Sequence, residues 1–176
     1  MANSVNRKPT YAFLGPVGTF TELALAQVKA AKNAKTIPVS TVTEAIEAVL
    51  SGKATRAIVP VENSIEGGVS ATLDALANTT DIRIFGEYLV PVTFNLVAKP
   101  GTKLADVKVI STHPTAYAQC REYLAANLPK HTHIPSTSTA AAAVGLLDKS
   151  SVADAAIAAK SITDHYKLTV LAKNIG

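Results

Sequence analysis

Short apolar runs alternate with amphipathic stretches along most of this chain, and no other feature constrains its fold as strongly. Apolar runs predict strands at 10–15, 35–40, 107–112, 132–136 and 154–159, and a buried strand at 56–63. Apolar residues at helical spacing predict helices at 19–32, 41–52, 68–79, 114–127, 139–150 and 160–167. Because strands that alternate with helices build parallel sheets with right-handed crossovers, we expect an α/β fold of mainly parallel sheets flanked by helices.

Individual residues sharpen some of these boundaries. Pro38 indicates that the strand around it lies at a sheet edge or ends there, because proline cannot donate to a strand ladder. Thr41 and Glu44 have the spacing of a capping box, and Gly52 is a typical helix stop. Pro114 suits the first turn of a helix.

Two extended segments, 82–99 and 168–176, lack a helical period. The first is longer than an ordinary strand of about 5 or 6 residues, so we expect it to leave one sheet and enter another. We therefore predict two lobes, with residues 1–88 and 168–176 in the first lobe and residues 89–167 in the second.

The composition excludes several classes of protein. The net charge of +4 comes from scattered Lys and Arg residues, and only 5% of residues are aromatic, so we expect no nucleic-acid binding. No apolar run approaches the roughly 20 residues of a membrane span, and the first residues lack the apolar core of a secretory signal. We therefore expect a cytoplasmic protein without membrane contacts. One cysteine and no spaced Cys/His set predict that no metal is bound.

Small polar residues and glycines gather at four strand-to-helix junctions, "GPVGTFT" (15–21), "ENSIEGGVS" (62–70), "STHP" (111–114) and "STSTA" (136–140). In parallel α/β sheets, ligands bind beyond the carboxyl ends of the strands, where helix N-termini favour anions. Asn63, Ser64 and Ser70 could orient such an anion, while the paired glycines let the backbone approach it. The alternative is that these residues only cap helices and form turns. Four junctions together favour a small-anion site between the lobes.

Nucleophilic catalysis fits the sequence poorly. There is no GxSxG elbow, and Cys120 lies within a predicted helix, where we expect an inert buried thiol. "GPVGTF" matches neither a phosphate-binding loop nor a dinucleotide fingerprint. His113 has three open roles: acid, hydrogen-bond donor or cap. Glu62 either orients donors or forms a salt bridge. The remaining histidines, which we expect to be solvated, are His131, His133 and His165.

The four junctions also carry a resemblance to a known family. The stretches "YAFLGPVGTFTELA", "VPVENSIEGGVSATLDAL", "STHPTAYAQCREYL" and "STSTAAAA" are similar in kind, order and spacing to motifs of the prephenate dehydratase catalytic domain. The resemblance covers Thr10 to Gly176. It implies a two-lobed fold like that of type 2 periplasmic binding proteins, with a ligand cleft between the lobes. It also implies that a homodimer or homotetramer converts prephenate to phenylpyruvate, water and carbon dioxide in phenylalanine biosynthesis, without a cofactor.

The resemblance implies roles for the residues at matching positions. Catalytic roles fall on Glu62, Asn63, Ser64, Thr112 and Gln119. Substrate-binding roles fall on Thr19, Phe20, His113, Ser138, Thr139 and Ala140. Thr112 stands where relatives often have Ser, a change that preserves the hydroxyl.

The family's domain continues into a Thr-Arg-Phe motif and then an ACT regulatory domain, whereas this sequence stops at Gly176. The threonine of that motif is the favoured proton donor, and its arginine can pair with a substrate carboxylate. The resemblance therefore implies a truncated chain with impaired turnover. Two alternatives are a noncatalytic small-anion-binding module of the same fold and an arogenate dehydratase, which acts on the amino analogue of prephenate.

Overall fold

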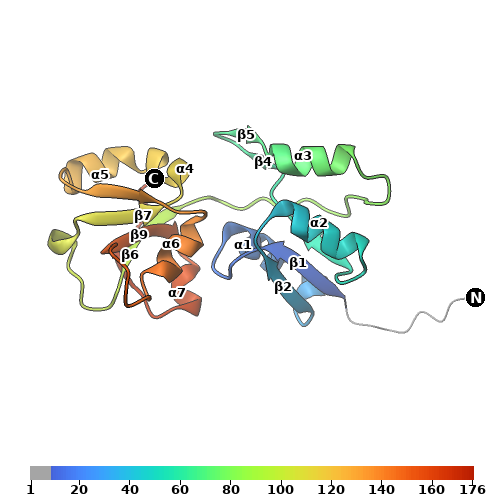
Figure 1. Ribbon diagram of the computed structural model, residues 1–176, viewed down its shortest axis with the longest axis horizontal. Coiled ribbons are helices and arrows are strands. Elements are labelled where there is room, and N and C mark those ends of the chain that lie inside the picture. Colours follow the sequence, from blue (N-terminus) through green and yellow to red (C-terminus); the bar gives the residue numbers. More distant parts are fainter. Residues whose placement is uncertain (1–8) are drawn as a thin grey trace, which may run out of the picture. The chain divides into compact units, whose positions relative to one another are not determined.

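The computed structural model describes residues 9–176 (Figure 1). Internal contacts group residues 9–16 and Thr21–Val90 into a first unit, and Val17–Phe20 and Pro91–Gly176 into a second unit. The predicted return of 168–176 to the first lobe is wrong. Strand β10 (Thr169–Ala172) pairs antiparallel with β6 (Phe94–Ala98) in the second unit, and this pairing satisfies backbone groups of the buried strand β6. Residues 1–8 of the predicted first lobe lie outside the described residues.

The first unit is built on a parallel three-stranded sheet in the order β2-β1-β3. Its strands are β1 (Thr10–Leu14), β2 (Lys35–Val39) and β3 (Arg56–Ile58). Its helices are α1 (Phe20–Gln27, whose first residue belongs to the second unit), α2 (Val42–Leu50) and α3 (Ser70–Ala77), with a 3-10 turn at Lys29–Ala31. Ala12 of the central strand shares a buried cluster with Ala45 and Ala48 of α2. These small side chains let the helix lie close to the sheet.

The predicted caps of α2 are confirmed. Thr41 Oγ1 accepts a hydrogen bond from the Glu44 N–H at 3.1 Å, and Glu44 Oε2 accepts one from the Ser40 N–H at 2.9 Å. The carboxylate thus reaches one residue further back than in a standard capping box. Gly52, at φ +72°, follows the helix in the left-handed region. β2 is an edge strand, which accommodates Pro38 as predicted.

The strand predicted at 56–63 is shorter and less buried than expected. Only Arg56–Ile58 joins the sheet, and the chain then forms a hairpin of β4 (Glu62–Asn63) and β5 (Gly67–Gly68). Pro60 has no N–H to donate, which favours an end to the ladder at this point. Thr72 Oγ1 of α3 donates to the Pro60 carbonyl at 2.6 Å and ties this segment to the helix.

The second unit is built on a five-stranded sheet in the order β10-β6-β9-β7-β8. β7 (Val109–Thr112), β8 (Thr132–Pro135) and β9 (Ala155–Ala159) run parallel to one another, whereas β6 runs antiparallel to its neighbours β9 and β10. Its helices are α4 (Pro114–Gln119), α5 (Arg121–Asn127), α6 (Thr139–Gly145) and α7 (Ile162–His165). The helix predicted at 114–127 is thus divided at Cys120. The prediction of an α/β fold is confirmed, with a mixed second sheet.

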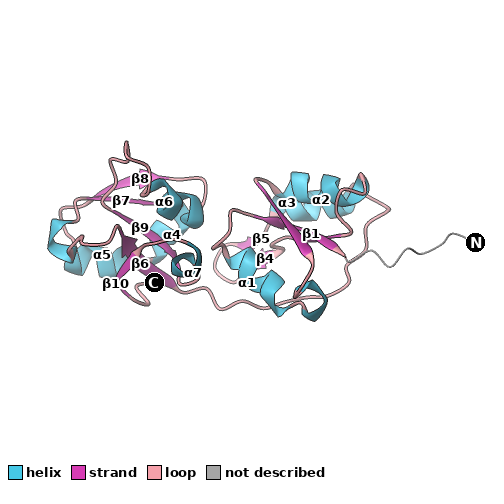
Figure 2. Cartoon of the chain, turned by 90° about the horizontal axis from the view of Figure 1, so that it is seen from below, coloured by secondary structure: helices cyan, strands magenta, loops and turns pink. Residues whose placement is uncertain are grey.

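Helices cover both faces of this second sheet (Figure 2). α4 and α5 share one buried core with Leu96 and Ile157, whereas α6 and α7 share another with Val97 and Ala158. Because neighbouring strand residues point to opposite faces, β6 and β9 are buried throughout. None of the helices within residues 9–176 is long and apolar enough to cross a membrane.

Candidate functional site

The motifs at 111–114 and 136–140, the third and fourth in chain order, lie side by side in the second unit. They follow the carboxyl ends of the parallel strands β7 and β8, and this end of the sheet is called its carboxyl edge. β7 and β8 pair with Thr112 opposite Pro135, so the turns that follow these strands leave from the same edge. The Ser136 N–H donates to the Thr112 carbonyl at 3.0 Å. His133 Nε2 lies 3.1 Å from the same carbonyl oxygen. The backbone at Thr112 is therefore held by two contacts from the β8 segment.

The side chain of Thr112 lies in a different environment from the one that a substrate contact requires. It is fully buried, and its hydroxyl donates to the Ile157 carbonyl of β9 at 2.9 Å. In this structure the hydroxyl links two neighbouring strands. A catalytic role would require it to exchange this partner for a substrate, and that role stays a prediction.

Both turns at this edge contain a side chain that caps the next helix. His113 is the N-cap of α4, and its Nδ1 accepts a hydrogen bond from the N–H two residues on at 3.3 Å. Ser138 is the N-cap of α6, and its Oγ accepts one from the N–H three residues on at 2.9 Å. Of the three roles left open for His113, the structure shows the cap. Thr139 is half-buried and Ala140 fully buried in the first turn of α6.

The first motif lies at the same edge of the second unit. The Gly18 carbonyl accepts a hydrogen bond from Ser161 Oγ, just after β9, at 3.2 Å. Thr19 is buried. The Phe20 ring meets the Phe94 ring edge-on, with centroids 5.6 Å apart and planes at 86°. Since Phe94 starts β6 opposite the last residue of β9, the first motif joins the third and fourth at this edge.

The second motif forms the hairpin of the first unit. Asn63 Oδ1 accepts hydrogen bonds from the Ile65 N–H at 2.9 Å and the Glu66 N–H at 3.4 Å, so this side chain closes the turn. Gly67, at φ +82°, supplies the left-handed backbone with which the chain enters β5. The amide of Asn63 and the left-handed backbone of Gly67 therefore have a structural function in the turn. The two other predicted residues, which are exposed on this hairpin, are Glu62 and Ser64.

The predicted residues fall into two sets. The first unit holds Glu62, Asn63 and Ser64. The second unit holds Thr19, Phe20, Thr112, His113, Gln119, Ser138, Thr139 and Ala140. Gln119 is half-buried as the last residue of α4. Apart from Gln119, the residues of each set lie on or beside turns that follow strands, as predicted from the polar strand-to-helix junctions.

The prediction that His131 and His133 are solvated is wrong. The His133 ring stacks on the Tyr117 ring of α4, with centroids 4.0 Å apart and planes at 7°. The Tyr117 hydroxyl lies 3.0 Å from His131 Nε2, and both histidines are half-buried. Side chains alternate along β8, so His133 and Ile134 face opposite sides of the sheet. This alternation could have indicated a face covered by a helix, although not the partner on that helix. His165 is exposed.

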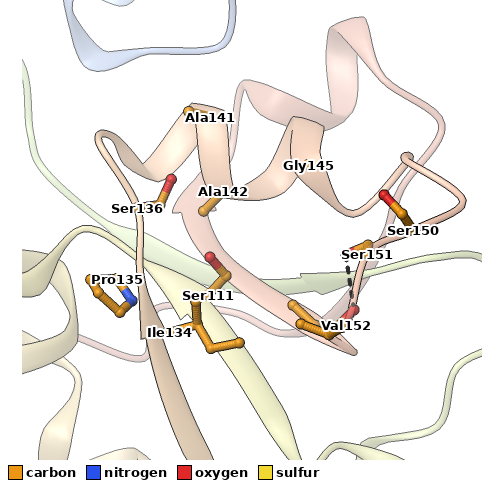
Figure 3. A pocket seen from close by; sticks show the side chains of 11 residues that line it. Ser111, Ile134, Pro135, Ser136, Ala141, Ala142, Gly145, Ser150, Ser151 and Val152 are labelled. Atoms are coloured by element: carbon orange, nitrogen blue, oxygen red, sulfur yellow. Dashed lines mark hydrogen bonds between the residues drawn. The ribbon is translucent and has the colours of Figure 1, made fainter.

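A groove of about 280 Å³ opens on the face of the sheet opposite His133, between α6 and the pair β7–β8 (Figure 3). Ser111 and Ile134 line it from the strands. Ala141 and Ala142 line it from the helix, and their small side chains leave space over the strands. None of the predicted site residues lines this groove.

Burial raises the pKa of the Cys120 thiol to about 12. The residue is fully buried in the core shared with α4 and α5. At neutral pH the thiol is therefore protonated and shielded, as predicted for an inert cysteine. Within residues 9–176, no three His, Cys, Asp or Glu side chains gather so that they could hold a metal ion.

Cys120 is expected to resist a thiol reagent at pH 8 in the folded protein and to react fully in denaturant. Rapid labelling of the folded protein would contradict this prediction.

The raised pKa of the Cys120 thiol also predicts a loss of stability at high pH. Below the ordinary pKa of 9.0 both states carry the protonated thiol, and between pH 9.0 and about 12 only the unfolded state ionises, so the free energy of unfolding falls as pH rises. Urea titrations at pH 8 and pH 10 measure this fall, which should be smaller in Cys120→Ala.

Comparison with known proteins places the chain among longer relatives. Residues 11–176 match the sequence model of the family described as prephenate dehydratase. A prephenate dehydratase of Mycolicibacterium vanbaalenii is 38% identical over 180 residues, covering 95% of this chain and 57% of the relative. The solved prephenate dehydratase of Arthrobacter aurescens, in complex with L-Phe, matches with a TM-score of 0.89 and 52% identity, covering 95% of this chain and 55% of that one. GqqA, described as a novel type of quorum quenching acylase, matches with a TM-score of 0.81 and 30% identity, covering 94% and 59%.

Proposed function

Because this chain belongs to the prephenate dehydratase family, we propose that it acts in the decarboxylating dehydration of prephenate to phenylpyruvate, a step of phenylalanine biosynthesis. The observation that carries the proposal is the family match over residues 11–176, which contains all four predicted motifs. The chain spans 57% of the Mycolicibacterium vanbaalenii relative, so the proposal concerns what these residues contribute to the reaction.

This reaction asks for little covalent chemistry from the protein. The bond between the ring of prephenate and its ring carboxylate breaks, and carbon dioxide leaves. The electron pair of that bond enters the ring, while the hydroxyl at the opposite ring position gains a proton and leaves as water. The gain of aromaticity drives the step, and no cofactor enters its balance. The protein has to bind two carboxylates, orient the ring and protonate the departing hydroxyl.

We assign the orienting contacts to amides and hydroxyls of the predicted set. The amide oxygen of Asn63 is used within the hairpin, so its NH2 group is the part that can donate to the substrate. Gln119 supplies a second amide on α4. The exposed Glu62 and Ser64 flank Asn63 and are proposed to assist it. The proposed substrate-binding residues are Thr19, Phe20, His113, Ser138, Thr139 and Ala140.

Three other functions make different demands on the same residues. A noncatalytic small-anion-binding module would bind prephenate without turning it over. An arogenate dehydratase would prefer the amino analogue. An acylase, the activity described for GqqA, would need an activated nucleophile. Cys120 is fully buried and inaccessible for this role, so a serine or threonine hydroxyl would have to serve.

A cytoplasmic location and a homodimeric or homotetrameric assembly are part of this proposal. Large exposed apolar side chains in the first unit support assembly, because such surface is typical of interfaces. Ile65, Phe85 and Leu89 expose 70%, 79% and 81% of their surface. Light scattering of the purified protein tests the assembly, and a monomer at every concentration would count against it.

The test uses two preparations, the 176-residue chain and a joined chain to which the unmatched part of the Arthrobacter aurescens relative is added. We expect the joined chain to form phenylpyruvate from prephenate, followed by ultraviolet absorbance. Because the 176-residue chain spans 57% of the Mycolicibacterium vanbaalenii relative, we expect it to bind prephenate and to turn it over slowly or not at all. Parallel rates with arogenate decide between the two dehydratase activities.

The outcomes separate the candidate functions. A folded joined chain that forms no phenylpyruvate would remove the enzyme proposal. If that protein still bound prephenate in a calorimetric titration, the binding module would stand. A larger kcat/KM for arogenate would replace the substrate and keep the reaction type.

A further inference from the structure

We propose that His133 is a positioning residue for the third motif, acting through the carbonyl of Thr112 and held in place by the ring of Tyr117. The inference rests on the proposed function, because it assigns His133 a part in that reaction. His133 and Tyr117 lie outside the set of residues predicted to touch the substrate. Their contacts join β8, α4 and the end of β7.

The first step is the hydrogen bond to Thr112. His133 Nε2 lies 3.1 Å from the Thr112 carbonyl oxygen, which also accepts the Ser136 N–H at 3.0 Å. A carbonyl oxygen only accepts, so Nε2 of His133 carries the proton. The Thr112 hydroxyl is already bound to the Ile157 carbonyl at 2.9 Å. The last residue of β7 is thus tied to β9 by its side chain and to the β8 segment by its carbonyl.

The second step is the orientation of the His133 ring. It lies parallel to the Tyr117 ring, with centroids 4.0 Å apart and planes at 7°. A stack alone allows sliding, but the Tyr117 hydroxyl lies 3.0 Å from His131 Nε2, and His131 Nδ1 lies 2.6 Å from the Leu128 carbonyl. Because that carbonyl accepts, Nδ1 of His131 donates and its Nε2 accepts from the tyrosine. Tyr117 is therefore anchored at its hydroxyl, which limits sliding of the stack.

The third step connects these contacts to the reaction. His113 follows Thr112 directly, and Gln119 lies two residues beyond Tyr117 on α4, which has only six residues. The bond at Thr112 and the stack at Tyr117 therefore fix the two ends of the segment that carries these proposed site residues. A displacement of about 1 Å in such a segment can lower a rate by as much as about a hundredfold. A residue with a purely structural role would change stability and leave the rate of the folded protein unaltered.

The experiment compares two substitutions in the joined chain. His133→Phe keeps a ring against Tyr117 and removes the donor, whereas His133→Gln places an amide nitrogen where Nε2 lies. We expect kcat/KM for prephenate to fall about tenfold in His133→Phe, mostly through kcat, and to recover to within about threefold in His133→Gln. The matched control is His165→Phe, which removes an exposed histidine of the same unit and should leave kcat/KM unchanged.

Amide hydrogen exchange of the 176-residue chain tests the contact without an activity assay. The Ser136 N–H shares the Thr112 carbonyl with His133, so its exchange should accelerate in His133→Phe and return toward the wild-type rate in His133→Gln. If His133→Phe does not fold, Tyr117→Phe keeps the stack and removes only the hydroxyl anchor. It should lower kcat by about threefold.

Unchanged kcat/KM in His133→Phe, or equal losses in the Phe and Gln variants, would overturn the positioning role. The same holds if Tyr117→Phe has to be used and leaves kcat unchanged. A joined chain that converts no prephenate in its wild-type form would show that the proposed function has failed and would remove the role with it. In that case Ser136 exchange still decides whether the contact with Thr112 exists in solution.

Discussion

Asn63→Asp is expected to lower kcat/KM for prephenate about a hundredfold in the joined chain, without unfolding the hairpin. The side-chain oxygen of Asn63 accepts the Ile65 N–H at 2.9 Å and the Glu66 N–H at 3.4 Å, and a carboxylate accepts the same bonds. The substitution therefore keeps the turn and removes the NH2 donor. Losing one oriented donor typically costs about 3 kcal/mol of transition-state stabilisation, and the new negative charge opposes a dianionic substrate.

Asn63→Ala removes both roles of this side chain together, the acceptor of the turn and the donor to the substrate. It removes the turn acceptor as well as the donor, so it should also lower the free energy of unfolding by about 1 kcal/mol. The matched control is Asn33→Asp, which adds the same charge at an exposed turn of the same unit and should leave both quantities near wild type. An Asn63→Asp protein with more than half of the wild-type kcat/KM would limit Asn63 to its structural role. Denaturant titrations and initial rates supply the measurements.

The order of the elements could be predicted because each strand and helix carries its own periodicity and end signals. β1, β2, β7, β8 and β9 lie within the ranges that their apolar runs predict. Thr41 and Gly52 delimit α2 through contacts that span only a few residues. Clustering of polar residues after parallel strands likewise follows from strand direction alone. Local chemistry is sufficient for these features.

Contacts between distant segments could not be predicted in the same way. The sequence 168–176 favours an extended chain but does not specify the edge that it joins, and β10 pairs with β6. A hydroxyl at the end of β7 has the same sequence signature whether it meets a ligand or the Ile157 carbonyl, as Thr112 does. The position of His133 near a loop favoured a solvated side chain, but its ring stacks on Tyr117, which is 16 residues away on another element. Such pairings depend on which surfaces meet after the elements have formed.

Gly18→Ala is expected to destabilise the second unit by about 2 to 5 kcal/mol and to displace the first motif. Gly18 has φ +89°, and an added Cβ would lie 2.5 Å from Ile162 Cδ1 and 3.2 Å from Ile162 Cα. The left-handed backbone costs an alanine about 1 to 2 kcal/mol, and overpacking against the fully buried Ile162 costs about 1 to 3 kcal/mol more. Because Thr19 and Phe20 follow directly, kcat/KM for prephenate should fall as well.

Two comparisons separate the cost of the contact with Ile162 from the cost of the left-handed backbone at Gly18. Gly101 has φ +93° with nothing within 4 Å of an added Cβ, so Gly101→Ala should cost only the backbone term of about 1 to 2 kcal/mol. Ile162→Val removes Cδ1, the atom closest to the added Cβ, and should cost about 0.5 to 1.5 kcal/mol alone. The double substitution should then be more stable than the two single effects predict when added. Equal losses at Gly18 and Gly101, together with strict additivity at Ile162, would show that the β1–α1 turn does not pack against α7 as the structure has it.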